Sequence, residues 1–181
     1  MTTRKLQAGD SFPALPVPDA QGELRDLSRP VGAADWMMVV VYRGRHCPMC
    51  TRYLNALELR IADLRAIGVD VAAVSGDSAA QLEEHRTELE VRSFPLHHSL
   101  SLDQMEALGL YISDPRSPTE TDHPFAEPGL FVINGEGTLQ VVDISNNPFV
   151  RPDIDTLVSG LTWIRKPDNN YPIRGMRPYR D

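Results

Sequence analysis

One buried strand followed directly by two cysteines decides the fold: residues 36–51 read WMMVVVYRGRHCPMCT. The first seven residues are continuously apolar, which is typical of a strand covered on both faces of a mostly parallel sheet. Reactive groups of open α/β sheets gather at the carboxyl ends of strands. We therefore expect Cys47 to emerge where the strand ends and where a substrate can reach it.

The segment that follows completes a crossover unit. Apolar residues recur at helical spacing, at Leu54, Leu57, Ile61 and Leu64, and predict one amphipathic helix that ends at Gly68. Residues 69–74, VDVAAV, then predict a second strand. Strand, helix and strand in this order predict a right-handed parallel crossover.

The remaining elements are predicted from local signals. Ser78 with Gln81, and Ser101 with Gln104, are capping-box patterns that open two helices. Other segments carry strand, turn or helix patterns: a short edge hairpin at most within 10–30, short strands at 94–96 or 110–112, a hairpin of 129–133 with 138–144, and a helix over 153–165. Residues 113–127 predict a long polar loop, a kind of loop that is more often functional than idle.

Composition and charge restrict the class of protein. The chain has 181 residues and a net charge of −7, which argues against a nucleic-acid partner or an anionic membrane surface. We expect one domain over residues 1–166 and a basic tail over 167–181. No apolar run reaches the ~18 residues that span a bilayer, and the start lacks a secretory pattern, so we expect the cytoplasm.

The chemistry is predicted at the cysteine pair. Cys47 at the start of a helix would be stabilised as a thiolate by free N–H groups and the helix dipole, with Arg43, Arg45 and Arg52 adding positive charge. Cys50, one turn later, could attack a mixed disulfide on Cys47 and close an internal disulfide.

A metal site is the main alternative for two cysteines at this spacing. Zinc needs about four ligands, and the further candidates are His97, His98 and His123. Because no second cysteine pair exists, we predict redox chemistry with neither a metal nor another cofactor.

The motifs together resemble the thioredoxin-like superfamily, and within it the alkyl hydroperoxide reductase and thiol-specific antioxidant family, the peroxiredoxin-like proteins. The resemblance rests on four segments that span most of the chain: VVVYRGRHCPMC at 39–50, VSGDS at 74–78, FPL at 94–96 and EPGLFVI at 127–133. It implies an α/β fold with a central mixed β-sheet flanked by helices. It also implies a cis proline at Pro128 beside the cysteines, with Pro128 and Glu127 lining the substrate groove.

Departures from the family pattern leave the subfamily open. Peroxiredoxins carry Thr-x-x-Cys, so the resemblance aligns their peroxide-attacking cysteine with Cys50 and their threonine with Cys47. Their peroxide-polarising arginine matches Pro128 here, and Arg43 or Arg151 remain as spatial substitutes. His46 stands where thioredoxins have tryptophan, beside the nucleophile, where it could tune the pKa or the choice of partner.

Three functions follow. The first is a thiol-disulfide oxidoreductase with Cys47 as nucleophile, Cys50 as resolving thiol, and Pro128, Glu127, His46 and Arg43 around the substrate. The second is a thiol peroxidase acting on hydrogen peroxide or organic hydroperoxides. The third is a non-catalytic module that binds a partner through 113–127. The expected partners are a protein or small-molecule disulfide, or a peroxide, together with a thiol reductant, and a homodimer is left open.

Overall fold

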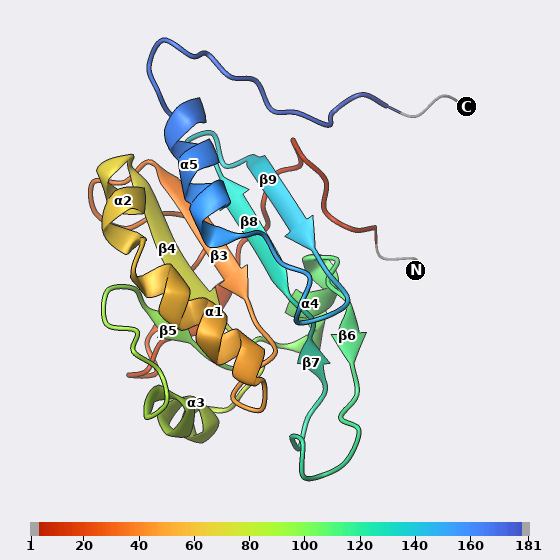
Figure 1. Ribbon diagram of the computed structural model, residues 1–181. Helices are drawn as coiled ribbons and strands as arrows, with labels where there is room; N and C mark the ends of the chain where they lie inside the picture. Colours follow the sequence, from red (N-terminus) through yellow and green to blue (C-terminus); the bar gives the residue numbers. More distant parts are fainter. Residues whose placement is uncertain (1–3, 179–181) are drawn as a thin grey trace.

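A mixed five-stranded sheet forms the centre of the computed structural model, which describes residues 4–178 (Figure 1). The strand order is β5-β4-β3-β8-β9. The strands are β3 (Trp36–Val41), β4 (Val69–Val74), β5 (Leu96–His97), β8 (Gly129–Ile133) and β9 (Leu139–Ile144). β3, β4 and β5 run parallel, whereas β8 and β9 are antiparallel to their neighbours. The predicted α/β class with a mixed sheet is confirmed.

The central strand β3 is buried on both of its faces. Met38 and Val40 point into one apolar cluster, and Met37, Val39 and Val41 point into the other. Side chains of a strand alternate between faces, so a continuously apolar run is what two covered faces require. The register of β3 is therefore strongly specified, and this fixes where the chain leaves the carboxyl end of the strand.

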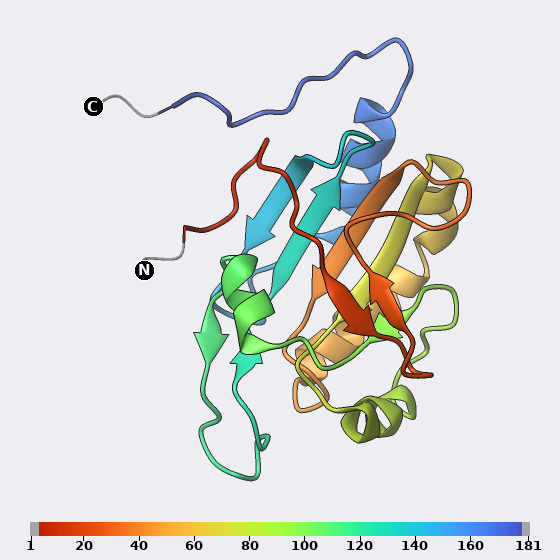
Figure 2. The same ribbon diagram turned by 180° about the vertical axis from the view of Figure 1, so that it is seen from behind.

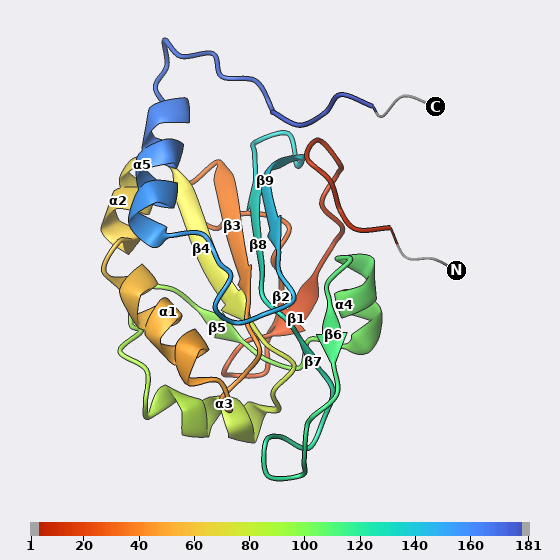
Figure 3. The same ribbon diagram turned by 45° about the vertical axis from the view of Figure 1, so that its right-hand side comes forward.

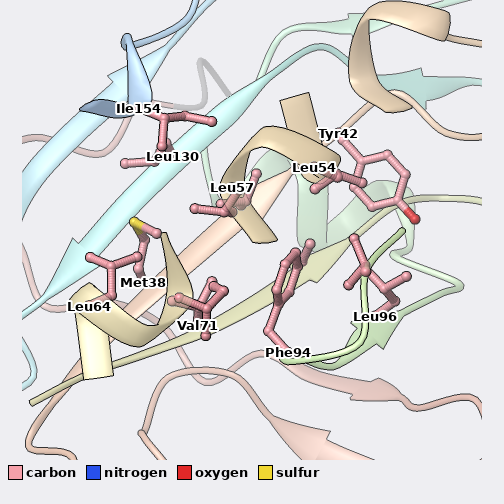
Figure 4. Close-up of a cluster of buried hydrophobic side chains, with 14 of the residues drawn as sticks. Met38, Tyr42, Leu54, Leu57, Leu64, Val71, Phe94, Leu96, Leu130 and Ile154 are labelled. Atoms are coloured by element: carbon pink, nitrogen blue, oxygen red, sulfur yellow. The ribbon is translucent and has the colours of Figure 1, made fainter. Parts of the chain in front are cut away.

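Three helices cover one face of the sheet: α1 (Pro48–Glu58), α2 (Ile61–Ala66) and α5 (Ile154–Ile164) (Figures 1 and 3). Leu54, Leu57 and Leu64 from α1 and α2 meet Met38 and Leu130 from the sheet in the core that Figure 4 shows. This packing fixes the start of α1 above the carboxyl end of β3.

The opposite face is covered by smaller elements (Figure 2). They are β1 (Pro16–Pro18), which pairs with β2 (Leu24–Asp26), and α4 (Leu102–Ala107). The predicted edge hairpin within 10–30 is therefore present. The buried side chains on this face of the sheet include no cysteine. They are aliphatic, aromatic or methionine side chains such as Leu15, Phe131 and Met105.

Both predicted capping boxes are present. The Ser78 and Ser101 hydroxyls accept hydrogen bonds from the backbone N–H three residues later, at the starts of α3 (Ala79–Arg86) and α4. The predicted loop 113–127 contains more structure than expected, because its ends pair as β6 (Ile112–Ser113) and β7 (Phe125–Ala126).

The single helix predicted to run to Gly68 is wrong: the chain forms α1 and α2 with a break at residues 59–60. Arg60 adopts φ −113° and ψ 4°, and its guanidinium pairs with Asp63 and Asp155. Leu57 and Ile61 stay buried on either side. The apolar spacing continues across the break, so spacing alone could not detect it.

The cis proline predicted at Pro128 is also wrong, since no cis peptide bond occurs among residues 4–178. Pro128 joins β7 to β8, and its carbonyl accepts a hydrogen bond from the Ser145 N–H at 3.0 Å. Glu127 donates its N–H to the Tyr111 carbonyl at 2.8 Å. This extended run between two paired strands accommodates a trans bond.

The described part of the basic tail packs against α5. The Tyr171 ring packs edge-on against Trp163 at 4.9 Å between ring centres. Residues 1–3 of the predicted domain and 179–181 of the predicted tail lie outside the described residues. Within 4–178, no helix has the length and apolar character needed to cross a membrane.

Candidate redox site

A tight turn at residues 43–47 connects β3 to α1 and rests on Asp77. Gly44 has φ +124°, and a Cβ at this position would collide with the Asp77 carboxylate. That carboxylate accepts a hydrogen bond from the Arg45 N–H at 2.8 Å, and Asp77 is 1% exposed. Asp77 therefore holds the turn.

Cys47 occupies the N-cap position of α1, and Pro48 is the first helical residue. The Cys47 sulfur accepts a hydrogen bond from the Cys50 N–H at 3.3 Å. Hydrogen bonds from the Cys50 thiol and N–H, aided by Arg151 and Arg43 and opposed by burial, lower the pKa of Cys47 to about 6. Cys47 is therefore largely a thiolate at neutral pH.

Cys50 has the opposite character. It is fully buried, and burial, followed by the neighbouring Cys47, raises the pKa of the Cys50 thiol. The Arg151 Nη2 group donates to its sulfur at 2.8 Å. The two sulfurs thus differ in protonation: Cys47 is a thiolate, and Cys50 remains a thiol. Thiol–disulfide exchange uses such a difference, because the thiolate attacks first.

The accessibility predicted for Cys47 differs from what the structure shows. Cys47 lies at the end of the central strand as expected, yet only 2% of it is exposed. A substrate can therefore reach the sulfur only after side chains or a loop around it move.

Arg43 is held by the loop between β6 and β7. Its Nε lies 3.3 Å from the Glu127 carboxylate and its Nη2 lies 3.7 Å from Glu120. The guanidinium also stacks over the Phe125 ring at 4.6 Å. Arg43 thus attaches residues 113–127 to the turn that carries Cys47.

Glu127 and Pro128 were predicted to line the substrate groove, which stays a prediction. Glu127 is 5% exposed and binds both Arg43 and the Ser113 hydroxyl, which donates at 2.7 Å. Pro128 borders a small void together with Arg151 and Tyr53. Both residues lie on the chain that passes the site, and the Glu127 carboxylate is paired with Arg43.

His46 packs against the Phe125 ring, with 4.5 Å between ring centres. Burial and then the Arg43 charge lower the pKa of His46 to about 4, so the imidazole is neutral at neutral pH. Its two ring nitrogens are buried and have no partner among residues 4–178. His46 therefore adds no positive charge beside Cys47.

The other histidines do not form a metal site. His97 and His98 approach backbone carbonyls of Pro18 and Asp19, and His123 lies 3.5 Å from Asp77. Over the described range, no group of three or more His, Cys, Asp or Glu side chains could hold a metal ion.

Two groups of functional residues escaped the sequence analysis. Glu120 and Phe125 belong to the loop that was singled out for its length, but no pattern pointed to their contacts with Arg43. Arg151 was named only as a spatial candidate. Arg151 lies between Pro148 and Pro152, directly before a helix, and this position is the sequence signal that could have pointed to a role for it.

Comparison with known proteins gives a family and a fold. The model of the AhpC/TSA family matches residues 8–142. No curated protein matches the sequence.

The structure is similar to several solved structures. A peroxiredoxin-like protein from Aquifex aeolicus has a TM-score of 0.72 at 17% identity, over 89% of each chain. The thiol peroxidase from Chromobacterium violaceum has a TM-score of 0.67 at 16% identity, over 90% of each chain. AhpC from Mycobacterium tuberculosis has a TM-score of 0.69 at 15% identity, over 91% of this chain and 96% of that one. At such identities the likeness shows the shared fold.

Proposed function

Since the chain belongs to the AhpC/TSA family, a family of thiol-based oxidoreductases, we propose that it is a thiol-disulfide oxidoreductase in which Cys47 and Cys50 exchange two electrons. One observation carries the proposal: the Cys47 sulfur accepts the Cys50 N–H hydrogen bond at a helix start, while the Cys50 sulfur is buried beside it. Only the first sulfur is a thiolate ready to attack.

The reaction proceeds in two exchanges. The Cys47 thiolate attacks one sulfur of a disulfide R–S–S–R, forms Cys47–S–S–R and releases RS⁻, which takes up a proton. The Cys50 thiol then loses its proton and attacks the Cys47 sulfur, so the Cys47–Cys50 disulfide forms and the second RSH leaves. The substrate gains two electrons. An external thiol reductant then supplies two electrons to the Cys47–Cys50 disulfide and restores the dithiol, in a reducing compartment such as the cytoplasm.

The second exchange needs Cys50 as a thiolate, which burial disfavours. The Arg151 guanidinium, 2.8 Å from its sulfur, stabilises the negative charge that develops there. Formation of the mixed disulfide also removes the Cys47 thiolate, whose negative charge opposes ionisation of Cys50. Cys50 thus becomes easier to ionise when it is needed.

Two single variants test this assignment. We expect Cys47→Ser to abolish reduction of a small disulfide substrate, and Cys50→Ser to stop after one exchange with a mixed disulfide on Cys47. Mass analysis of the trapped protein identifies the modified sulfur. Retained turnover in Cys47→Ser, or a mixed disulfide found on Cys50, would overturn the proposal.

Peroxide reduction is a second candidate, favoured by the Arg151 contact with Cys50. A cation beside a sulfur could polarise a peroxide: a thiolate takes one oxygen to become sulfenic acid, the O–O bond breaks, and water or an alcohol leaves. The neighbouring thiol then condenses with the sulfenic acid and releases water.

Rapid mixing of the reduced protein with hydrogen peroxide distinguishes the two candidates. Consumption far faster than that of an ordinary thiol at the same thiolate fraction would favour the peroxidase, and alkylation with mass analysis would show which cysteine oxidises first. Slow oxidation would favour disulfide exchange.

A further inference from the structure

A groove runs along the outer side of α1, beside the redox pair. It has a volume of about 600 Å³ and lies between α1 and residues 148–155. Met49 and Tyr53 contribute from the helix, and Phe149 contributes from the opposite wall. Small-molecule sites commonly have volumes of roughly 300–1,000 Å³, so the groove has room for a small ligand.

The groove carries a net positive charge, because three arginines line it against two aspartates. Arg52 is exposed, and within residues 4–178 it has neither a hydrogen bond nor an ion pair. Arg151 has two buried nitrogens, Nε and Nη1, that lack partners in the same described range. A ligand with an anionic group would pair with the exposed Arg52 guanidinium.

The acidic residues of the groove are already used. Asp155 pairs with Arg60, and Asp153 caps α5 by accepting the Thr156 N–H at 2.8 Å. Asp143 borders the adjoining void, and burial raises the pKa of its carboxyl. None of the three forms an ion pair with Arg52 or Arg151 in the described chain.

The groove also offers apolar surface to water. Phe149 is 67% exposed and Leu59 is 79% exposed, and both line it. Exposed apolar surface rimmed by charge is typical of a binding site. The chemistry that fits is therefore an anionic group on an apolar body.

Arg151 connects this groove to the reaction, because this residue lines the groove and its guanidinium contacts the Cys50 sulfur at 2.8 Å. We propose that the groove binds the substrate of the exchange reaction, a low-molecular-weight disulfide that bears a carboxylate on an apolar body. This inference rests on the proposed function and adds its substrate class. The disulfide gains two electrons from the Cys47–Cys50 pair and two protons, one from the Cys50 thiol and one from solvent, and gives two thiols.

Two disulfide probes test the groove. Dithiobis(nitrobenzoate) carries a carboxylate on each aromatic ring, whereas dithiodipyridine has aromatic rings and is neutral. The rate constants for the reduced full-length protein are compared as a ratio, because the ratio cancels any movement that both probes require. The variants are Arg52→Gln and Phe149→Ser.

Matched controls lie on the other face of the sheet. Arg29→Gln removes the same charge from another exposed arginine without an ion pair among the described residues. Leu24→Ser removes an apolar side chain that is 69% exposed, close to the value for Phe149.

The expected result is selective. Arg52→Gln should lower the rate with dithiobis(nitrobenzoate) by about three- to tenfold, the range for one charge-assisted contact, and should change the rate with dithiodipyridine by less than about twofold. Phe149→Ser should slow both probes, and neither control should change the ratio.

Other outcomes overturn the inference. An equal effect of Arg52→Gln on both probes, or an effect of Arg29→Gln as large as that of Arg52→Gln, excludes a carboxylate site in the groove and leaves the proposed function standing. If the unmodified protein reacts with neither probe through Cys47, the proposed function fails and the inference fails with it.

Discussion

Arg43 and Arg151 both lower the pKa of Cys47, yet the regions that hold them differ. Arg43 lies between Glu127 and Glu120 and stacks on Phe125, so loop 113–127 neutralises its charge. Arg151 donates to the Cys50 sulfur and lies over the Tyr53 ring at 5.0 Å, but no carboxylate pairs with it and two of its nitrogens lack partners in the described chain. The comparison teaches that a cation surrounded by carboxylates holds a structure together, whereas an unneutralised cation is available for chemistry.

The largest expected effect of a substitution at either arginine is on stability, in the Arg43 region. Arg43→Gln leaves the nearly buried Glu127 carboxylate without its cation, and loss of one partner of a buried pair is costly. We expect the free energy of unfolding to fall by about 3 kcal/mol, the lower end for a buried pair, measured by urea unfolding. The double variant with Glu127→Gln should regain part of this loss. An unchanged stability of Arg43→Gln would refute the structural role of Arg43.

The next effect is on reactivity, in the Arg151 region. Arg151→Gln should raise the pKa of Cys47, because an unneutralised cation near the sulfur is lost. The thiolate is the reactive form, so the rate of alkylation rises as pH increases through about 6 in the unmodified protein. In the variant this rise should occur at higher pH.

The charge-neutral double variant Arg43→Gln/Glu127→Gln is the control for that titration. It removes one cation and one carboxylate together, so it should shift the rate profile much less than Arg151→Gln. A larger shift in the double variant would reverse the comparison between the two regions.

The smallest effect comes from one hydrogen bond in the Arg43 region. Ser113→Ala removes the donor to Glu127 at 2.7 Å and should cost about 1 kcal/mol of stability, while the Cys47 rate profile stays in place. Ser117→Ala, at an exposed hydroxyl that bonds only with Thr119 in the described chain, is the matched control. Equal losses of stability in both variants would show that the Glu127 contact contributes nothing.

The sequence predicted the parts of the fold that depend on neighbours along the chain. The continuous apolar run of β3, the capping boxes at Ser78 and Ser101, and the hairpin of β8 with β9 are all confirmed. The family resemblance is confirmed by the AhpC/TSA match. These signals are local, or they lie in motifs that the family shares.

The rest depends on contacts that sequence spacing does not encode. The break at Arg60 is accompanied by an ion pair with Asp155, 95 residues away. The contact of Arg151 with Cys50 joins residues 101 positions apart. The cis proline expected at Pro128 came from the resemblance alone, and the pairing of Glu127 and Pro128 with the flanking chain fits a trans bond.

Because both sulfurs are enclosed, the reactivity of the cysteine pair reports how often the site opens. Cys47 is 2% exposed and Cys50 is fully buried, so a thiol reagent in solution reacts only during excursions that uncover them. When the site closes again faster than the reagent reacts, the labelling rate is the chemical rate multiplied by the fraction of time that the site is uncovered. Labelling under native conditions would therefore measure the free energy of that local fluctuation at the protein's own cysteines, without an engineered label.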